Sequence, residues 1–236
     1  MTSLANLRDV ATGATRLRPG VLFRSDAPHA GDLAPALEGW PPRTVLDLRS
    51  AEELANEHPL AEAGAEVIGV PLAAQASLEG LADAAARYGG ELGAMYRDIV
   101  AGAAPALARA VALIAESDGP VLIHCTMGKD RTGLLVAAVL AAVGEPRERI
   151  IADYALTEPN VAGVLERVRL ANPEGALAAA LERTIDERPW LLQAPASAIE
   201  AALNLWDEHP GGAAGWLQDR GVSPQQLTRL RERLLA

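Results

Sequence analysis

The chain has 236 residues, of which 50% are hydrophobic and 22% are charged, and it carries a formal net charge of −10. Its length suits one domain, because single hydrophobic cores stop growing near ~250 residues, and its apolar content excludes an intrinsically disordered protein. The acidic balance argues against a surface that coats nucleic acid or adheres to membranes. We therefore expect one domain over residues 1–236, in which any bound anion must lie in a local positive pocket.

No apolar run in the sequence approaches the ~18–20 residues that are needed to span a bilayer. Residues 1–20 also lack the apolar core of a secretory signal. These observations favour a cytoplasmic protein without nucleic-acid partners and without stable membrane insertion. They leave unconventional export and the oligomeric state open.

Short runs rich in β-branched and large apolar residues, each bounded by Gly, Pro or charged residues, are typical of strands. They predict strands at 21–23, 44–48, 66–70 and 121–124. Helical patterns lie between and after them, at 51–57, 92–102, 105–116, 132–143 and 146–156. From residue 158 onward the sequence predicts helices alone, at 158–170, 174–187, 195–208, 212–219 and 223–235.

Strands and helices that precede a purely helical segment favour an α/β fold. We expect a small, mostly parallel sheet flanked by helices, with a helical C-terminal third, residues 158–236, packed on the same domain. The segment 73–100 is rich in small residues and contains Gly89-Gly90, which predicts a flap or lid.

Cys125 is the only cysteine in the chain, and Lys129, four positions later, is the only lysine. A single cysteine excludes an intrachain disulfide and a zinc cluster with several cysteines. Both residues fall in the stretch 119–133, GPVLIHCTMGKDRTG, which predicts a buried strand, a loop and then an apolar helix. We therefore place the candidate chemistry in this loop.

The loop has the composition of a site for a tetrahedral anion. Successive backbone N–H groups from Thr126 to Arg131 can surround such an anion, and the helix that begins near Thr132 adds partial positive charge. Gly128 permits backbone angles that a Cβ would forbid, and Arg131 can hold two phosphate oxygens through its planar fork. Cys125, at the base of the loop, is then expected to be a thiolate at neutral pH, aligned for in-line attack on phosphorus.

The stretch resembles the signature of the cysteine-dependent phosphatases, which is His-Cys, five residues, and Arg followed by Thr or Ser and Gly. Five residues match it position by position: His124, Cys125, Arg131, Thr132 and Gly133. The interior Gly128-Lys129-Asp130 is similar to the bacterial tyrosine phosphatases that also act on phosphoserine, phosphothreonine and phosphoinositides. Other stretches resemble motifs of that branch, at 6–10 (NLRDV), 17–25 (LRPGVLFRS), 45–50 (VLDLRS), 151–154 (IADY) and 215–223 (GWLQDRGVS).

The resemblance implies a role for each residue of the loop. Cys125 would be the nucleophile, and Arg131 would clamp the phosphate and stabilise the transition state. Thr132 would hydrogen-bond the cysteine sulfur, His124 would orient the loop, and Lys129 would add charge at its rim. The remaining positions would contribute mainly backbone N–H groups: Thr126, Met127 and Gly128.

The general acid has two candidates. Asp130, inside the loop, is the acid that the resembling branch offers. Asp47, at the end of the strand predicted at 44–48, is the second, because sites assemble at the carboxyl ends of strands in open α/β sheets. The stretch Trp40-Pro41-Pro42 lacks an Asp, so we interpret it as a false match to the acid loop of other tyrosine phosphatases. Whichever Asp acts must be protonated for cleavage and ionised to activate water afterwards.

Two further sets of polar residues are expected to be structural. Three residues that follow predicted strands are expected to form ion pairs outside the catalytic set: Arg24, Asp26 and Arg49. The histidines outside the loop have no partner at metal-ligand spacing and are expected on the surface: His29, His58 and His209.

The function expected from these residues is hydrolysis of phosphate monoesters through a cysteinyl-phosphate intermediate. Phosphotyrosine in proteins is the expected substrate, with phosphoserine, phosphothreonine and phosphoinositides as wider alternatives. No metal or organic cofactor is expected, because the loop supplies the positive charge that a metal would supply. Two rivals remain open: a phosphoinositide- or phosphopeptide-binding module without activity, and a rhodanese-like sulfurtransferase, whose loop places four rather than five residues before its Arg.

Overall fold

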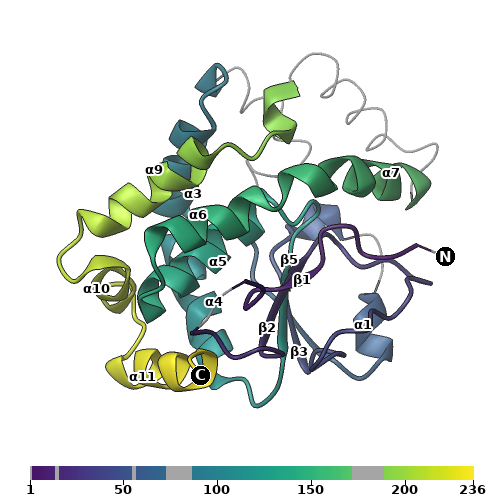
Figure 1. The fold of residues 1–236 in the computed structure, drawn as a ribbon, viewed down its shortest axis with the longest axis horizontal. Helices are drawn as coiled ribbons and strands as arrows, with labels where there is room; N and C mark the ends of the chain where they lie inside the picture. Colours follow the sequence, from purple (N-terminus) through teal and green to yellow (C-terminus); the bar gives the residue numbers. More distant parts are fainter. Residues whose placement is uncertain (1, 14–15, 55–56, 73–86, 172–188) are drawn as a thin grey trace.

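The structure is a computed structural model, which describes residues 2–13, 16–54, 57–72, 87–171 and 189–236. Within these residues the sheet has five strands in the order β1-β2-β5-β3-β4 (Figure 1). Strands β2, β5, β3 and β4 pair in parallel, whereas β1 pairs with β2 in the antiparallel direction. The bounds are Arg8–Asp9 (β1), Leu22–Ser25 (β2), Thr44–Asp47 (β3), Glu66–Gly69 (β4) and Val121–His124 (β5).

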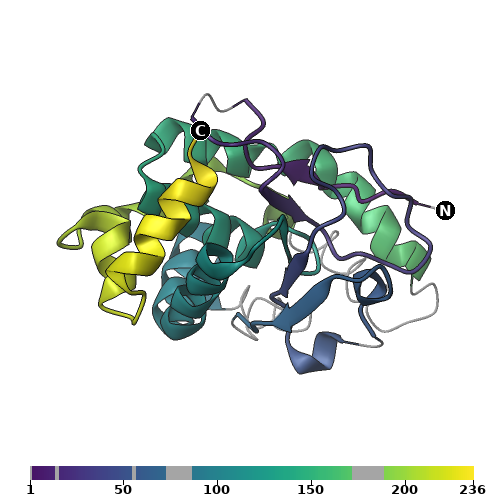
Figure 2. The same ribbon diagram turned by 90° about the horizontal axis from the view of Figure 1, so that it is seen from below.

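The two faces of the sheet are covered differently. On one face Phe23, Val45 and Leu122 form a small apolar cluster, against which Leu60 of α1 (Pro59–Glu62) and Trp40 pack. The other face carries the main core, and Figure 2 shows the large group of helices to this side of the sheet. The central strand β5 is therefore buried along its whole length, as expected for a parallel strand that is covered on both faces.

The main core surrounds helix α5, which is apolar on nearly every side and is contacted by most of the helices around it. Residues of the sheet and of the C-terminal helices belong to the same cluster of buried side chains. These helices are α3 (Leu92–Gly102), α4 (Ala104–Glu116), α5 (Asp130–Val143), α6 (Arg147–Ala155), α7 (Val161–Ala171), α9 (Ala196–Asp207), α10 (Gly212–Gln218) and α11 (Pro224–Leu234). Short 3-10 turns lie at Ala51–Glu53, Glu158–Asn160 and Pro189–Leu192.

The expected α/β fold with a mostly parallel sheet is confirmed, and the differences concern short elements. The predicted helix at 51–57 is only a 3-10 turn in its described part, and the predicted helix at 158–170 is split into a 3-10 turn and α7. Neither β1 nor α1 was predicted, because two and four residues are too short to carry a periodic pattern.

The segment expected to form a flap or lid, 73–100, lies partly outside the described residues, as does the predicted helix at 174–187. Its last part is the beginning of α3, whose buried side chains include Met95 and Tyr96. That part belongs to the core. Within the described residues, no single helix combines the length and apolar composition needed to cross a membrane, although α3 and α4 would meet that test as a pair, bent by 76°.

Candidate active site

The ends of three parallel strands bring the candidate residues to one edge of the sheet. In the register of the sheet, His124 at the end of β5 lies opposite Ser25 of β2 and Asp47 of β3. Because the carboxyl ends of parallel strands meet at the same edge, the loop that follows β5 opens where such folds build their sites. We call residues 125–131 the phosphate loop.

Gly128 is required by the shape of the phosphate loop. Its φ of +67° lies in the left-handed region, and a Cβ at this position would lie 2.3 Å from the carbonyl oxygen of Ser25. Any other residue would therefore push the loop away from the end of β2.

The carbonyl groups of the phosphate loop are held by residues outside it. Asn6 Nδ2 donates to the carbonyl oxygens of Met127 and Gly128 at 3.2 and 3.1 Å, and Arg24 Nη2 donates to that of Gly128 at 2.8 Å. A trans peptide directs its N–H away from its C=O, so the N–H groups of Gly128 and Lys129, which share peptides with these two carbonyls, face the opposite side. The N–H groups of Thr126, Met127 and Gly128 donate to no described residue, which leaves them available for an anion.

Arg131 and Thr132 each leave a buried polar atom without a partner among the described residues. These atoms are Nε of Arg131 and Oγ1 of Thr132, both on the first turn of α5 and close to the buried Cys125 in the chain. The hydrogen bond from Thr132 to the cysteine sulfur that the resemblance implies is thus not formed in this structure. Because native structures rarely leave buried donors unsatisfied, both atoms remain able to donate to a bound group.

Glu53 is a site residue that the sequence analysis did not identify. Its carboxylate accepts hydrogen bonds from Nη1 and Nη2 of Arg131, at 2.5 and 2.8 Å, and one from Thr126 Oγ1 at 2.6 Å. Burial opposes ionisation, but Arg131 and Thr126 together hold the pKa of Glu53 below its usual value. The Ser50-x-x-Glu53 spacing was the available signal, and the Ser50 N–H does donate to Glu53. That spacing predicts only a helix start, however.

The same contacts keep Arg131 charged. Burial lowers the pKa of Arg131, but the hydrogen bonds that Arg131 donates to Glu53 and its electrostatic interaction with Cys125 raise that pKa further above its usual range. The guanidinium is therefore a cation at any working pH. Its two amino groups face Glu53 and its Nε remains free of described partners.

We expect Glu53→Gln to lower the thermal stability, because an amide leaves Arg131 buried without a counter-charge. The loss is on the order of 1–3 kcal/mol, and each kcal/mol shifts the Tm of a chain of this length by about 2–4 °C. Inorganic phosphate should raise the Tm of the variant more than that of the wild type, because the anion replaces the missing negative charge. Thermal unfolding with and without phosphate measures both effects, and equal phosphate shifts in the two proteins would contradict this expectation.

Lys129 and Asp130 lie side by side where the phosphate loop enters α5. Lys129 Nζ lies 3.1 Å from Oδ1 of Asp130 and donates to the carbonyl oxygen of Gln193 at 2.9 Å. Lys129 is thus fully buried rather than exposed at the rim, and it ties the loop to the segment before α9. The side chain of Asp130 is 14% exposed.

Asp47 lies behind the loop in a strongly ionising environment. Arg49 donates to both of its carboxylate oxygens, from Nε to Oδ1 at 3.0 Å and from Nη2 to Oδ2 at 2.7 Å, and His124 Nε2 lies 3.7 Å from Oδ2. Burial alone would raise the pKa of Asp47, but these neighbours lower it to about 2. Because burial keeps His124 neutral near pH 7, with a pKa of about 4, Arg49 is the cation that acts on Asp47 there.

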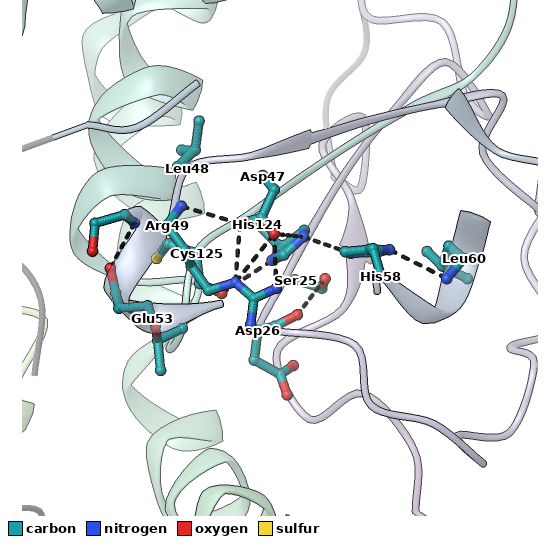
Figure 3. A network of polar contacts seen from close by, with 12 residues as sticks. Ser25, Asp26, Asp47, Leu48, Arg49, Glu53, His58, Leu60, His124 and Cys125 are labelled. Carbon is teal, nitrogen blue, oxygen red and sulfur yellow. Dashed lines mark hydrogen bonds and ion pairs between the residues drawn. The ribbon is translucent and has the colours of Figure 1, made fainter. Parts of the chain in front are cut away.

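His58, which was expected on the surface, is buried against the signature histidine (Figure 3), so that expectation was wrong. Its Nε2 lies 2.9 Å from Nε2 of His124, and its Nδ1 accepts a hydrogen bond from the N–H of Leu60. Because that N–H can only donate, we assign the imidazole proton of neutral His58 to Nε2, which donates to His124. His124 then carries its own proton on Nδ1, 3.2 Å from the carbonyl oxygen of Cys125. The two histidines therefore connect α1 to the first peptide of the phosphate loop.

The same three buried side chains place potential metal-ligand atoms close together. One atom each of Asp47, His58 and His124 lies within 4.8 Å of the other two. Zinc bound through Nε2 of both histidines would need the proton of His58 on Nδ1, where the N–H of Leu60 already donates. A hydrogen-bonded pair of neutral histidines fits this cluster better than a metal ion does.

We expect the folded state to lose stability as the pH falls from 6.5 towards 4. Burial is the main cause that lowers the pKa of His124 from 6.5 to about 4, and the pKa of His58 is lowered in the same direction. Between these values the unfolded chain binds more protons than the native state, so each pH unit removes about 1.4 kcal/mol for one such group. Urea unfolding across this range should show the loss in the wild type and a weaker dependence in His124→Asn. The same slope in both proteins would argue against His124 as its source.

The three residues that were expected to form ion pairs do form them within the described structure. The pairs are Arg24–Asp153, Asp26–Arg167 and Arg49–Asp47, at 2.5, 2.6 and 2.7 Å. Two of these residues also support the site, since Arg24 holds the Gly128 carbonyl and Arg49 neutralises Asp47.

Comparisons with known proteins agree with this geometry. The sequence pattern of the tyrosine phosphatase family matches residues 1–236. The triple specificity protein phosphatase PtpB of Mycobacterium tuberculosis is 33% identical over 269 aligned residues, which cover 98% of this chain and 96% of that protein. A tyrosine-protein phosphatase of Nostoc commune is 34% identical over 128 residues, which cover 52% of this chain and 41% of that protein.

Proposed function

Since this chain belongs to the tyrosine phosphatase family and is a protein tyrosine phosphatase, we propose that it hydrolyses phosphate monoesters through a cysteinyl-phosphate intermediate on Cys125. The observation that carries the proposal is the unfilled set of donors around the phosphate loop. Backbone N–H groups at Thr126 to Gly128 and the Nε of Arg131 have no partner among the described residues. Together they supply local positive charge in a chain whose net charge is −10.

In the first step the Cys125 thiolate attacks phosphorus, so that an S–P bond forms and the P–O bond to the substrate breaks. The loop amides and Arg131 hold the phosphoryl oxygens, and Asp130 gives its proton to the departing oxygen. In the second step the ionised Asp130 takes a proton from water, which attacks phosphorus as the S–P bond breaks. The Oγ1 of Thr132, which has no partner among the described residues, then donates a hydrogen bond to the departing sulfur.

The surroundings of the two aspartates support Asp130 as the general acid. The pKa of Asp47, lowered to about 2, leaves that carboxyl without a proton to give near neutral pH. Asp47 is also only 4% exposed, and its carboxylate accepts hydrogen bonds from Arg49. Asp130 lies in the loop itself, and part of its side chain is accessible. We therefore assign proton transfer to Asp130. Asp47 instead anchors the side chains of Arg49 and His124.

Phosphotyrosine in proteins is the proposed main substrate, with phosphoserine, phosphothreonine and phosphoinositides as further substrates. The wider range is supported by the Gly128-Lys129-Asp130 interior and by the name of the Mycobacterium tuberculosis relative, a triple specificity phosphatase. In the structure Lys129 contacts Asp130 and Gln193, so its side chain adds no argument for phosphoinositides.

The two rival functions are less compatible with the residues present. A binding module without activity would not need Cys125, Asp130 and Arg131 together. A sulfurtransferase of the rhodanese type would place four residues between its cysteine and arginine, and this loop has five, from Thr126 to Asp130.

Rapid-quench trapping with a phosphotyrosine peptide tests the mechanism, followed by mass spectrometry of the modified peptide. Phosphate on Cys125 during turnover supports the proposal, and turnover without any phosphate on Cys125 contradicts it. Phosphate release from a phosphothreonine peptide and a monophosphorylated phosphoinositide then measures the substrate range. Tight binding of all three without release would favour the binding module, and transfer of sulfur from thiosulfate to cyanide would favour the sulfurtransferase.

A further inference from the structure

Two buried tyrosine hydroxyls form a chain of hydrogen bonds that ends at Asp130. Tyr96 Oη on α3 lies 2.6 Å from Oδ1 of Asp130, and Tyr154 Oη on α6 lies 2.7 Å from Tyr96 Oη. The rings meet edge to face, with centroids 6.0 Å apart, and both side chains are buried. The ring of Tyr154 also lies against Gly133, where a Cβ would come within 3.0 Å of it. The pair therefore connects two core helices to the first turn of α5.

The direction of the hydrogen bonds follows from the chemistry of the groups. An ionised carboxylate only accepts, so Tyr96 donates to Asp130, and the Tyr96 oxygen accepts from Tyr154. Burial, followed by the charge of Asp130, raises the pKa of both tyrosines above the usual value. Both phenols thus keep their protons and act as donors at any working pH.

The neighbouring side chains of Asp130 that the structure describes contact only one of its two carboxylate oxygens, Oδ1. Tyr96 and the Lys129 ammonium both lie near Oδ1, at 2.6 and 3.1 Å. A carboxyl group that is held through one oxygen presents the other in a defined direction. Among the described residues, the charged and titratable groups around Asp130 are Tyr96 of α3, Tyr154 of α6, the adjacent Lys129, and Arg131 of α5.

We propose that Tyr96, supported by Tyr154, is a positioning residue for proton transfer, which holds Oδ1 of Asp130 so that Oδ2 delivers the proton to the leaving oxygen. The inference rests on the proposed role of Asp130 as general acid. When the P–O bond breaks, the proton on Oδ2 passes to the leaving oxygen, and the hydrogen bond from Tyr96 stabilises the carboxylate that remains. The same carboxylate then accepts a proton from water in the second step.

Tyr96→Phe tests the inference by comparing p-nitrophenyl phosphate with phenyl phosphate. The two substrates differ little in size, but phenoxide is much more basic and needs the acid, whereas p-nitrophenoxide departs readily without it. We expect kcat for phenyl phosphate to fall about tenfold and kcat for p-nitrophenyl phosphate to fall less than about threefold, a part of the ~10²–10⁴-fold that general acids contribute. A structural defect of the phosphate loop would instead lower both rates equally, and that result would overturn the inference.

The pH profile provides a second readout. Without the Tyr96 hydroxyl the carboxylate loses a donated hydrogen bond that stabilises its ionised form, so the alkaline limb of kcat/KM should move to higher pH. An unchanged limb in Tyr96→Phe would count against the proposed positioning.

Three further variants separate the causes. Tyr88→Phe is the matched control, because Tyr88 Oη donates to the exposed Asp98 at 2.8 Å and the same atom is removed away from the site. The double variant Tyr96→Phe/Tyr154→Phe leaves no unpaired buried hydroxyl, and it should reproduce the leaving-group effect of Tyr96→Phe. Asp130→Asn should lower phenyl phosphate hydrolysis further still. If Asp130→Asn leaves it unchanged, the general-acid proposal fails; if only Tyr96→Phe leaves the substrate ratio and pH limb unchanged, the positioning inference alone fails.

Discussion

Replacing Cys125 with serine is expected to lower phosphate release by at least about a thousandfold while inorganic phosphate still binds. A serine hydroxyl has nearly the same size as the thiol but is not ionised near neutral pH, so no S–P bond or equivalent intermediate forms at a useful rate. The loop amides and Arg131, which we propose hold the phosphate, are unchanged by the substitution. Turnover of a phosphotyrosine peptide and the phosphate-dependent rise in Tm measure the two effects separately.

Cys125→Ala serves as the comparison, because it removes the hydroxyl as well as the thiol. We expect it to be as inactive as Cys125→Ser and to bind phosphate comparably. A serine variant that keeps most of the wild-type rate would show that the chemistry does not pass through residue 125. Loss of phosphate binding in both variants would contradict the assignment of the anion site to the loop amides and Arg131.

The second large effect is expected for Arg131→Lys, which should lower kcat/KM by about 10²–10³. Lysine keeps the charge but loses the planar fork, whose amino groups donate to Glu53 while its Nε has no partner among the described residues. An ammonium cannot satisfy Glu53 and a phosphoryl oxygen in the same geometry. Steady-state kinetics with p-nitrophenyl phosphate measures the loss.

Arg167→Lys is the matched control for this substitution. Arg167 is also a buried arginine that pairs with carboxylates, at 2.6 Å from Asp26 and 2.7 Å from Asp32, but it has no contact with Cys125 or the loop amides. Its kcat/KM should remain within about threefold of the wild type, far from the ~10²–10³ that a lost transition-state contact costs. Similar losses in the two variants would mean that Arg131 acts through general stability and not through the phosphoryl group.

The main elements of the fold were predictable because their patterns are local. The runs rich in β-branched and apolar residues that became β2 to β5 and the apolar helix α5 are visible over short windows. The helix predicted at 92–102 has the bounds of α3 in the structure. Short elements such as β1 and α1 were missed, because their stability comes from neighbours and not from their own sequence.

Contacts between distant positions were not predictable in the same way. His58 has polar neighbours in the sequence, yet α1 brings it beneath His124, 66 positions away. The motif places Lys129 beside the phosphate site, yet the segment before α9 covers it and accepts its hydrogen bond. Burial of a polar side chain depends on which segments pack against it in the tertiary structure, and a single sequence does not show these packing partners.

By itself, the sequence predicted the proposed nucleophile, phosphate clamp and anion-binding loop, because these residues lie within seven consecutive positions, 125–131, whose spacing is the signature of that chemistry. Only the tertiary structure decided which residues support them. Glu53 reaches Arg131 across 78 positions, and Tyr96 reaches Asp130 across 34. These pairs exist because β3 lies beside β5 in the sheet and because α3 packs against α5. Strand order and helix packing are set by the burial of the whole core, and they bring together side chains that no local pattern connects.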